Sequence, residues 1–311
     1  MARILTLFLD GVGLGADDPR RNPFSKANLP CLSELLDGQR LVADSAPIET
    51  ETSTLIGLDA CMGVEGMPQS ATGQASLLTG RNVAVEIGMH YGPKPNQAIR
   101  DIIQIDNLFS QVKRKGGRLS LLNGYPPGYF AAIERGHRLY SVIPQAIVAS
   151  GFHLQTVEDM QAGRAFSADF TARGWSERVG FPPVPIYTPI EAGRQMVSAC
   201  KAFDLCWFDY WLTDYVGHKQ DMAQAVGLLE VFDEVLAGLL ESWRIDQDLV
   251  VLTSDHGNME DLQARGHTRN AVLCLSIGPA HLRQEFTRDL TDLAGFAPAT
   301  LRALFGEQAS P

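Results

Sequence analysis

The 311-residue sequence has little of what marks secreted, membrane or nucleic-acid-binding proteins. Its five cysteines are an odd number without a C-x-x-C pair, which indicates free thiols in a reducing compartment. No apolar run approaches about 18 residues, and Met1-Ala2-Arg3 leads directly into an apolar run, so we expect neither a membrane span nor a signal peptide. These absences favour a cytoplasmic protein.

Extended positive charge is absent as well. The formal net charge is −10, and the longest basic run is Lys113-Arg114-Lys115. Nucleic acid is therefore not expected as a partner. The chain is long enough for one large domain with an insertion.

Several short apolar runs predict buried strands of an open sheet. They cover residues 4–9, 204–209, 249–253 and 271–275. Runs of this length and composition are typical of strands that are covered on both faces. Open α/β sheets place their functional sites beyond the carboxyl ends of their strands. The expected fold class is therefore α/β.

Residue types that bind divalent metals lie next to these runs. Asp10 follows the first run, and Asp255 with His256 follows the third. Asp214 and His218 are spaced i, i+4, which on a helix brings a carboxylate and an imidazole to one face. Each alone has an ordinary explanation, such as a turn or a surface helix pair. Together they predict a two-metal site of the kind that assists phosphoryl transfer.

A hydroxyl and a further histidine complete the set. Ser70 opens the segment SATGQASLLTGR, and His267 precedes Thr268-Arg269-Asn270 and the fourth run. A serine before a helix is most often an N-cap. Beside metal ligands its hydroxyl can also attack phosphorus, while helix amides face the phosphate. We expect Ser70 to be the nucleophile, with Thr72 as the competing residue.

These segments together resemble the alkaline phosphatase superfamily, most closely its metalloenzyme branch, which contains cofactor-independent phosphoglycerate mutase and phosphopentomutase. The branch pattern is a strand-end Asp, a helix opening S-x-x-G-H with a following G-R, then D-x-x-x-H, D-H-G and a His before T-x-N. The matching segments are Asp10, Ser70 to Gln74, Gly80-Arg81, Asp214 to His218, Asp255 to Gly257 and His267 to Asn270. Gln74 departs from the pattern, because the mutases usually carry His there.

The resemblance implies two metal sites with distinct ligands. One ion would be held by Asp10, Ser70, Asp255 and His256, and the other by Asp214, His218 and His267. Ligands of these types suit Mn or Zn, and the mutase-like branch favours Mn. The implied fold is an alkaline-phosphatase-like three-layer core with a largely parallel central sheet and an inserted cap domain.

The expected domains are a metal-binding core of residues 1–90 and 186–311 and an inserted cap of residues 91–185. Glycines and prolines between 88 and 95 mark the departure from the core, and Phe181 to Pro185 mark the return. Residues 119–123 could form another core strand, which would leave a smaller cap from Gly124 onward. We expect the stretch from about 38 to 69 to be irregular.

Three kinds of function fit this set of residues. A phosphatase or phosphodiesterase needs an open site where water can attack a phosphoserine, whereas a phosphomutase must retain that intermediate while its substrate reorients. The phosphoglycerate mutases of this branch use a much larger cap rich in Arg and Asp, and the insertion here is shorter and has no such cluster. We therefore expect hydrolysis of a small phosphorylated metabolite, with a phosphomutase or phosphodiesterase as the alternative. The complete ligand set disfavours a non-catalytic binding protein.

Overall fold

The computed structural model describes residues 2–178 and 180–306. At its centre is a seven-stranded sheet with the order β2-β3-β7-β6-β1-β5-β4. The strands are β1 (Ile4–Leu9), β2 (Ile48–Glu49), β3 (Ser53–Leu58), β4 (Leu119–Leu121), β5 (Leu205–Tyr210), β6 (Leu249–Thr253) and β7 (Val272–Ile277).

Four neighbouring strands are parallel, and the remaining edge of the sheet is antiparallel. β1 pairs in parallel with β5 and β6, and β4 pairs in parallel with β5. β7 is antiparallel to both β6 and β3, and β2 is antiparallel to β3. Because β7 runs in the opposite direction, the loop before β7 lies at the edge where β1, β5 and β6 end.

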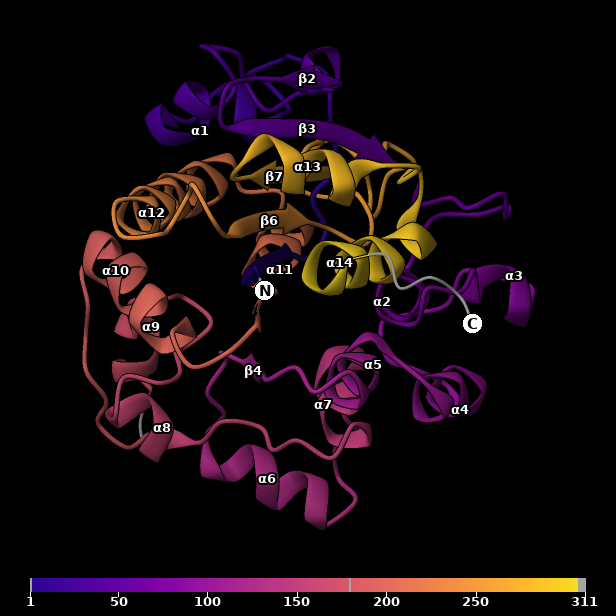
Figure 1. Ribbon diagram of the computed structural model, residues 1–311, viewed down its shortest axis with the longest axis vertical. Helices are drawn as coiled ribbons and strands as arrows, with labels where there is room; N and C mark the ends of the chain where they lie inside the picture. Colours follow the sequence, from indigo (N-terminus) through magenta and orange to yellow (C-terminus); the bar gives the residue numbers. More distant parts are fainter. Residues whose placement is uncertain (1, 179, 307–311) are drawn as a thin grey trace.

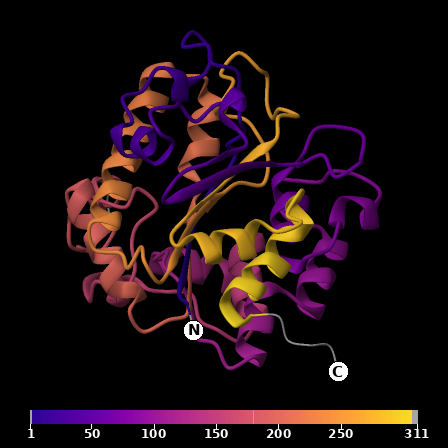
Figure 2. The same cartoon turned by 45° about the horizontal axis from the view of Figure 1, so that its top comes forward.

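Helices cover both faces of the sheet, so the predicted three-layer α/β fold is confirmed (Figures 1 and 2). On one face are α2 (Ser70–Thr79), α4 (Gln97–Ile105), α5 (Leu108–Arg114), α7 (Val142–Ala149), α13 (Ala280–Thr287) and α14 (Phe296–Phe305). On the other are α1 (Pro30–Leu35), α10 (Pro189–Cys200) and α12 (Met222–Leu240). The shorter helices are α3 (Val83–Ile87), α6 (Pro127–Glu134), α8 (Val157–Gln161), α9 (Arg173–Ser176) and α11 (Leu212–Lys219). Within the described ranges, none of the helices combines the length and hydrophobicity needed to cross a bilayer.

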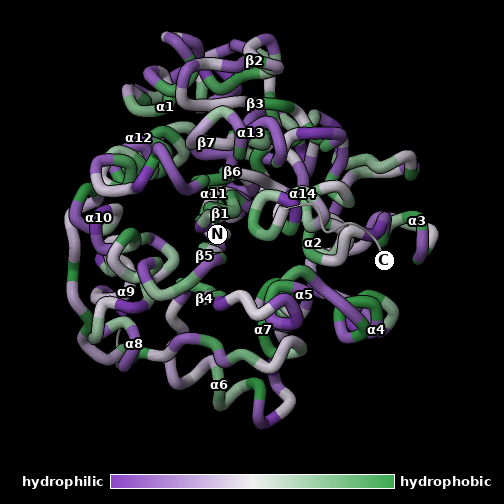
Figure 3. The backbone as a smooth tube through the Cα atoms, viewed as in Figure 1, coloured by the Kyte–Doolittle hydropathy of each residue, from purple (hydrophilic) through white to green (hydrophobic). Residues whose placement is uncertain are grey.

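The side chains of β1 show how the two hydrophobic layers form. Ile4 and Phe8 point into the layer that contains α2, whereas Leu5, Leu7 and Leu9 point into the layer that contains α12. This alternation follows from the two-residue repeat of a strand, and burial on both faces explains why the strand is almost entirely apolar. Hydrophobic and hydrophilic segments alternate along α12 in Figure 3, as expected for a helix with one buried face.

Two short segments of the sheet differ from the simplest prediction. The expectation of an irregular stretch from 38 to 69 is wrong for β2 and β3, because β3 pairs with all of β7, more than 200 residues later. Gly57 interrupts the apolar alternation of β3, which made the strand hard to recognise. β4 pairs with β5 at the edge of the sheet, so the alternative boundary at Gly124 leaves β4 with the core. The division into core and cap itself stays a prediction.

Candidate metal centre

The segments that carry the predicted ligands meet at one edge of the sheet. Asp10 directly follows β1, and Asp255 follows β6 after one intervening residue. α11, which follows β5, carries Asp214 and His218. The first residue of α2 is Ser70, and His267 lies in the loop before β7. The strand order therefore joins ligands that are up to 257 positions apart in sequence (267 − 10).

The first group surrounds His256. Its Nε2 atom lies 3.4 Å from Asp10 Oδ1, 3.6 Å from Asp255 Oδ2 and 3.0 Å from Ser70 Oγ. Asp10, Asp255 and His256 each offer one possible ligand atom, and these three atoms all lie within 4.8 Å of one another. Asp10 Oδ1 is buried and has no hydrogen-bond partner among the described residues. Because a buried carboxylate oxygen without a partner is costly, this group fits a divalent cation.

The second group surrounds Asp214. Its Oδ1 atom lies 3.4 Å from His218 Nε2 and 3.8 Å from His267 Nε2. Possible ligand atoms of Asp214, His267 and His256 also lie within 4.8 Å of one another. The rings of His256 and His267 stack at a centroid distance of 3.7 Å. His218 lies beside this set through its contact with Asp214. The two groups are therefore adjacent, with His256 between them, as a two-metal site requires.

Neutral side chains hold several of these ligands in position. Gln74 Nε2 donates to Asp255 Oδ2 at 3.0 Å and to Asp10 Oδ2 at 3.3 Å. Asn258 Nδ2 donates to Asp214 Oδ1 at 2.6 Å. Such contacts from outside the ligand set orient the ligating atoms. Sequence reasoning noticed Gln74 only as a departure from a pattern and missed Asn258, although Asn258 lies in the TSDHGNMED segment.

Glu260 connects three loops of the centre and was also missed. Its buried carboxylate accepts hydrogen bonds from Gly13 N at 2.9 Å, Asn258 N at 2.8 Å and Asn270 Nδ2 at 3.0 Å, and one from the Thr268 hydroxyl. These donors come from the loops after β1 and β6 and from the segment before β7. Four donors compensate a buried carboxylate well. Glu260 therefore has a structural role.

Burial and mutual repulsion shift the pKa values of the cluster. Burial raises the pKa of Asp10 to about 6, although the neighbouring His256 lowers it. Burial and the Asp10 charge raise the pKa of Asp255 well above its usual range. Burial alone would lower the pKa of His256, but Asp255 and Asp10 raise it to about 10. Burial and then His256 lower the pKa of His267 to about 4. Protons and divalent cations therefore compete for the same carboxylates.

The two candidate hydroxyl nucleophiles point to different places. Ser70 is not the N-cap of α2, because Gln69 occupies that position, and the Ser70 hydroxyl instead contacts His256. The Thr72 hydroxyl donates to Gln69 O at 3.1 Å and accepts from Tyr91 N at 3.2 Å. A phosphate-binding amide would face the ligand cluster. The Thr72 amide instead donates to Tyr91 O. This geometry favours Ser70 over Thr72.

Gly73 allows α2 to approach the end of β6. A Cβ atom at position 73 would lie 2.6 Å from the backbone oxygen of Asp255 and 2.9 Å from its Cβ. Contacts this close do not occur in folded proteins without displacement of the backbone. The absence of a side chain at Gly73 is therefore what brings Ser70 and Gln74 to the ligands.

An unexpected carboxyl group lies at the end of β5. Asp209 is buried, its Oδ1 atom has no hydrogen-bond partner among the described residues, and its backbone is fixed by both side-chain groups of Asn123. Burial and the nearby Asp255 raise the pKa of Asp209 to about 7. A single aspartate inside an apolar run gave no sequence signal for this environment.

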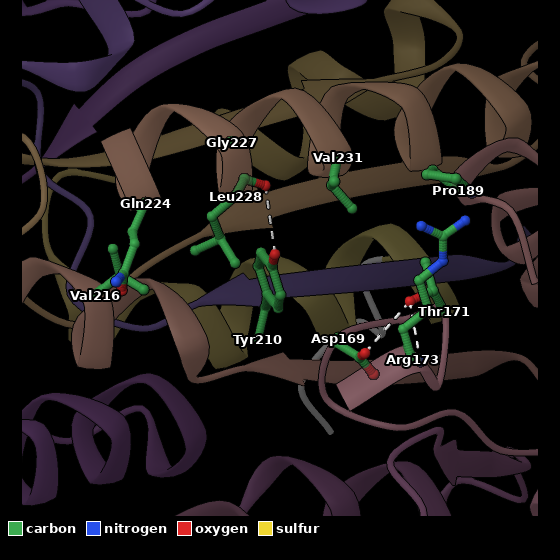
Figure 4. A pocket seen from close by; sticks show the side chains of 10 residues that line it. All are labelled: Asp169, Thr171, Arg173, Pro189, Tyr210, Val216, Gln224, Gly227, Leu228 and Val231. Atoms are coloured by element: carbon green, nitrogen blue, oxygen red, sulfur yellow. Dashed lines mark hydrogen bonds between the residues drawn. The ribbon is translucent and has the colours of Figure 1, made fainter. Parts of the chain in front are cut away.

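A cavity of about 380 Å³ is lined by residues of α11 and α12 (Figure 4). Val216 lines it from α11, and Leu228 lines it from α12. The Tyr210 hydroxyl donates to Leu228 O across it at 3.5 Å. Val216 is two residues from both Asp214 and His218, which places it on the opposite side of the helix from them. The lining of this cavity therefore contains none of the predicted metal ligands.

Comparison with known proteins gives a partial sequence match. Residues 187–307 match the model of the Metalloenzyme superfamily. A 2,3-bisphosphoglycerate-independent phosphoglycerate mutase of Desulforudis audaxviator is 33% identical over 111 residues, or 32% of this chain and 22% of the relative. One from Moorella thermoacetica is 24% identical over 194 residues, or 54% of this chain and 37% of the relative. A phosphopentomutase of Serratia proteamaculans is 36% identical over 63 residues, or 20% of this chain and 15% of the relative. The chain thus covers well under half the length of these relatives.

Solved structures are similar over nearly the whole chain at low sequence identity. A Pyrococcus horikoshii protein has a TM-score of 0.61 at 13% identity, covering 100% of this chain and 98% of its own. Alkaline phosphatase from the Antarctic bacterium TAB5 has a TM-score of 0.54 at 11% identity, covering 98% of each chain. Phosphoglycerate mutase of Leishmania mexicana has a TM-score of 0.51 at 13% identity, covering 99% of this chain and 96% of its own. These similarities confirm the alkaline-phosphatase-like fold.

Proposed function

We propose that this chain is a two-metal phosphoryl-transfer enzyme which hydrolyses a small phosphate ester. The premise is that residues 187–307 match the Metalloenzyme superfamily and that the chain has an alkaline-phosphatase-like fold. The observation that supports this most strongly is the position of the Ser70 hydroxyl, 3.0 Å from His256 Nε2 at the start of α2. A hydroxyl next to two clusters of metal-binding residues is the arrangement that nucleophilic attack on phosphorus needs.

The proposed ligand sets follow the two groups of side chains. Asp10, Ser70, Asp255 and His256 would hold one divalent ion, and Asp214, His218 and His267 the other, with Mn or Zn as the metal. When bound, the ions would supply Lewis acidity that lowers the pKa of the Ser70 hydroxyl and neutralises phosphate charge. Gln74 and Asn258 would keep the carboxylates of both sets oriented.

The residues of the chain would then carry out a two-step displacement. The Ser70 hydroxyl gives its proton to solvent and Oγ attacks the phosphorus, the bond between phosphorus and the ester oxygen breaks, and the ester oxygen takes a proton from solvent as the alcohol leaves. The product is a phosphoserine whose charge the Ala71 amide in the first turn of α2 would help to stabilise. Water then attacks the phosphoserine, the bond between phosphorus and Oγ breaks, and phosphate is released.

A phosphomutase is the second candidate, because the curated relatives named above are phosphoglycerate mutases and a phosphopentomutase. In that reaction the phosphoserine would return its phosphoryl group to another hydroxyl of the same molecule. Residues 91–185, or a smaller cap from Gly124 onward, would select the metabolite in either case. A screen of phosphorylated metabolites that records both free phosphate and isomer formation separates the two: isomer without free phosphate would establish the mutase.

Substitution of Ser70 tests the proposed function. Ser70→Ala should keep the fold and most of the metal, yet lower the turnover rate by at least about 10³, as expected for removal of a covalent nucleophile. Thr72→Ala is the matched control and should cost much less. Acid quenching after brief exposure to substrate, followed by peptide mass analysis, should find phosphate on the peptide that contains Ser70. Phosphate on Thr72, or near-normal turnover by Ser70→Ala, would contradict the assignment.

A further inference from the structure

The helix that carries two of the proposed metal ligands also exposes two aromatic rings. Trp211 directly precedes α11 with a helical backbone and is 40% exposed, and Tyr215 is 52% exposed. Positions 211, 214, 215 and 218 are three or four residues apart, so their side chains lie along one face of the helix. The two rings therefore alternate with Asp214 and His218 on a single stripe.

The packing of α11 does not account for this exposure. The helix is anchored through Thr213, Val216 and Gly217, which are buried. The other three tryptophans of the chain are at most 7% exposed: Trp175, Trp207 and Trp243. Because burial of a large ring is favourable, two neighbouring exposed rings beside a candidate site indicate a binding surface.

The two rings form a corner. Their centroids are 6.4 Å apart and their planes are inclined at 76°. A planar group can stack on the face of one ring while it meets the edge of the other, and both contacts are favourable for aromatic pairs. Lys219 Nζ lies 4.4 Å from the Tyr215 centroid, at the opposite end of the stripe from Trp211, and adds positive charge there.

The spacing of the stripe fits one small molecule. Neighbouring side chains at this spacing have Cβ atoms about 5–6 Å apart. A phosphate held near Asp214 and His218 and a ring held against Trp211 or Tyr215 would therefore be separated by about one turn of helix. That distance suits a ring joined to the phosphate directly or through a sugar.

We propose that Trp211 and Tyr215 bind a planar aromatic ring in the alcohol portion of the substrate. The inference rests on the proposed function, because it assigns the non-reacting end of the molecule whose phosphate reaches Ser70. The substrate class is then a phosphate ester of an aromatic alcohol or of a nucleoside. Both carry a ring face that stacks on an aromatic side chain.

Two phosphonates of similar size test the inference. Phenylphosphonate and cyclohexylphosphonate resist hydrolysis and differ in the planarity of the ring, so their dissociation constants can be measured by calorimetry on the metal-loaded full chain. Stacking should favour phenylphosphonate by about tenfold. Trp211→Ala and Tyr215→Ala should each reduce that ratio to about threefold or less, whereas Trp211→Phe should retain most of it. Ile105→Ala, at a 72% exposed position on α4, is the control and should leave the ratio unchanged.

A second comparison separates the two kinds of ring. Adenosine 5′-phosphate should bind more tightly than ribose 5-phosphate to the metal-loaded Ser70→Ala variant if the ring is a nucleobase, and no more tightly if the ring is a simple aryl group. Equal binding of phenylphosphonate and cyclohexylphosphonate, or a preference that survives both alanine substitutions, would overturn the inference. If orthophosphate binds and Ser70 is phosphorylated without any ring preference, only this inference fails. If orthophosphate does not bind and Ser70 is never phosphorylated, the proposed function fails with it.

Discussion

Asp209 has an environment very different from that of an ordinary aspartate. Its carboxyl group is buried at the end of β5 and its pKa is raised to about 7, first by burial and then by the charge of Asp255. An aspartate in the unfolded chain ionises with a pKa near 3.8. The folded protein therefore binds more protons than the unfolded chain between these two values, and its stability falls as the pH rises through about 7.

Substitution of Asp209 should remove this pH dependence. In metal-free protein held in chelator, Asp209→Asn should gain stability relative to the wild type as the pH is raised from 4 to 8. The full difference of about three pKa units corresponds to at most about 4 kcal/mol. Urea unfolding at several pH values measures it. Asp246→Asn, at an exposed position, is the control; a constant difference between Asp209→Asn and the wild type at all pH values would contradict the prediction.

Single residues also show where sequence reasoning stopped. The seven ligand candidates could be predicted because each belongs to a short pattern, and all except Ser70 lie near an apolar run. Glu260 and Asn258 act on the ligands or their loops through hydrogen bonds to segments that are distant in sequence. Both lie in the TSDHGNMED segment, but that segment does not reveal which distant groups they contact, so their roles required the fold.

At the scale of elements, the contact between α2 and the end of β6 makes a sharp prediction. Gly73→Ala would place a methyl group 2.6 Å from Asp255 O, so α2 must shift away from the ligands. We expect a loss of stability of roughly 1–3 kcal/mol, as for overpacked cores, and weaker metal binding. Gly128→Ala in α6 is a matched control, because no atom lies within 4 Å of the added Cβ. Thermal unfolding and metal titration of both variants provide the measurement; similar behaviour of the two would refute the role of Gly73.

The strands divide into those that the sequence predicts and those that it does not. β1, β5 and β6 are mostly apolar and are buried on both sides, so their local sequences alone predict strands. β2 has two residues and β4 has three, and both lie at edges of the sheet. Such short strands are defined by their partners more than by their own composition, which is why β2 escaped prediction and β4 was only an alternative.

For the whole molecule, bound metal should dominate stability. Under metal-replete conditions the purified chain should contain close to two divalent ions, and chelation should lower the melting temperature. A ligand present at 1,000 times its dissociation constant stabilises the folded state by about 4 kcal/mol. His218→Ala should remove mainly one ion, because the side chain contacts only the Asp214 group and is 46% exposed. His281→Ala, on the surface of α13, should remove none. Elemental analysis that finds no metal in the wild-type protein would refute the two-metal assignment.

The position of β1 between β5 and β6 has a consequence for biosynthesis. The partners of Ile4 in these strands are Leu205 and Leu249, which are translated 201 and 245 residues later (205 − 4 and 249 − 4). At about 5–20 residues per second, the ribosome needs roughly 10–50 s to supply both partners. The apolar segment ILTLFL has neither of its strand neighbours until β5 has been made, and it lacks β6 until the end of the interval. The nascent chain must therefore keep β1 soluble until Asp10, Ser70, Asp214 and His218, four of the seven predicted ligands, have been made. We expect this apolar strand to be accessible to chaperones during that time.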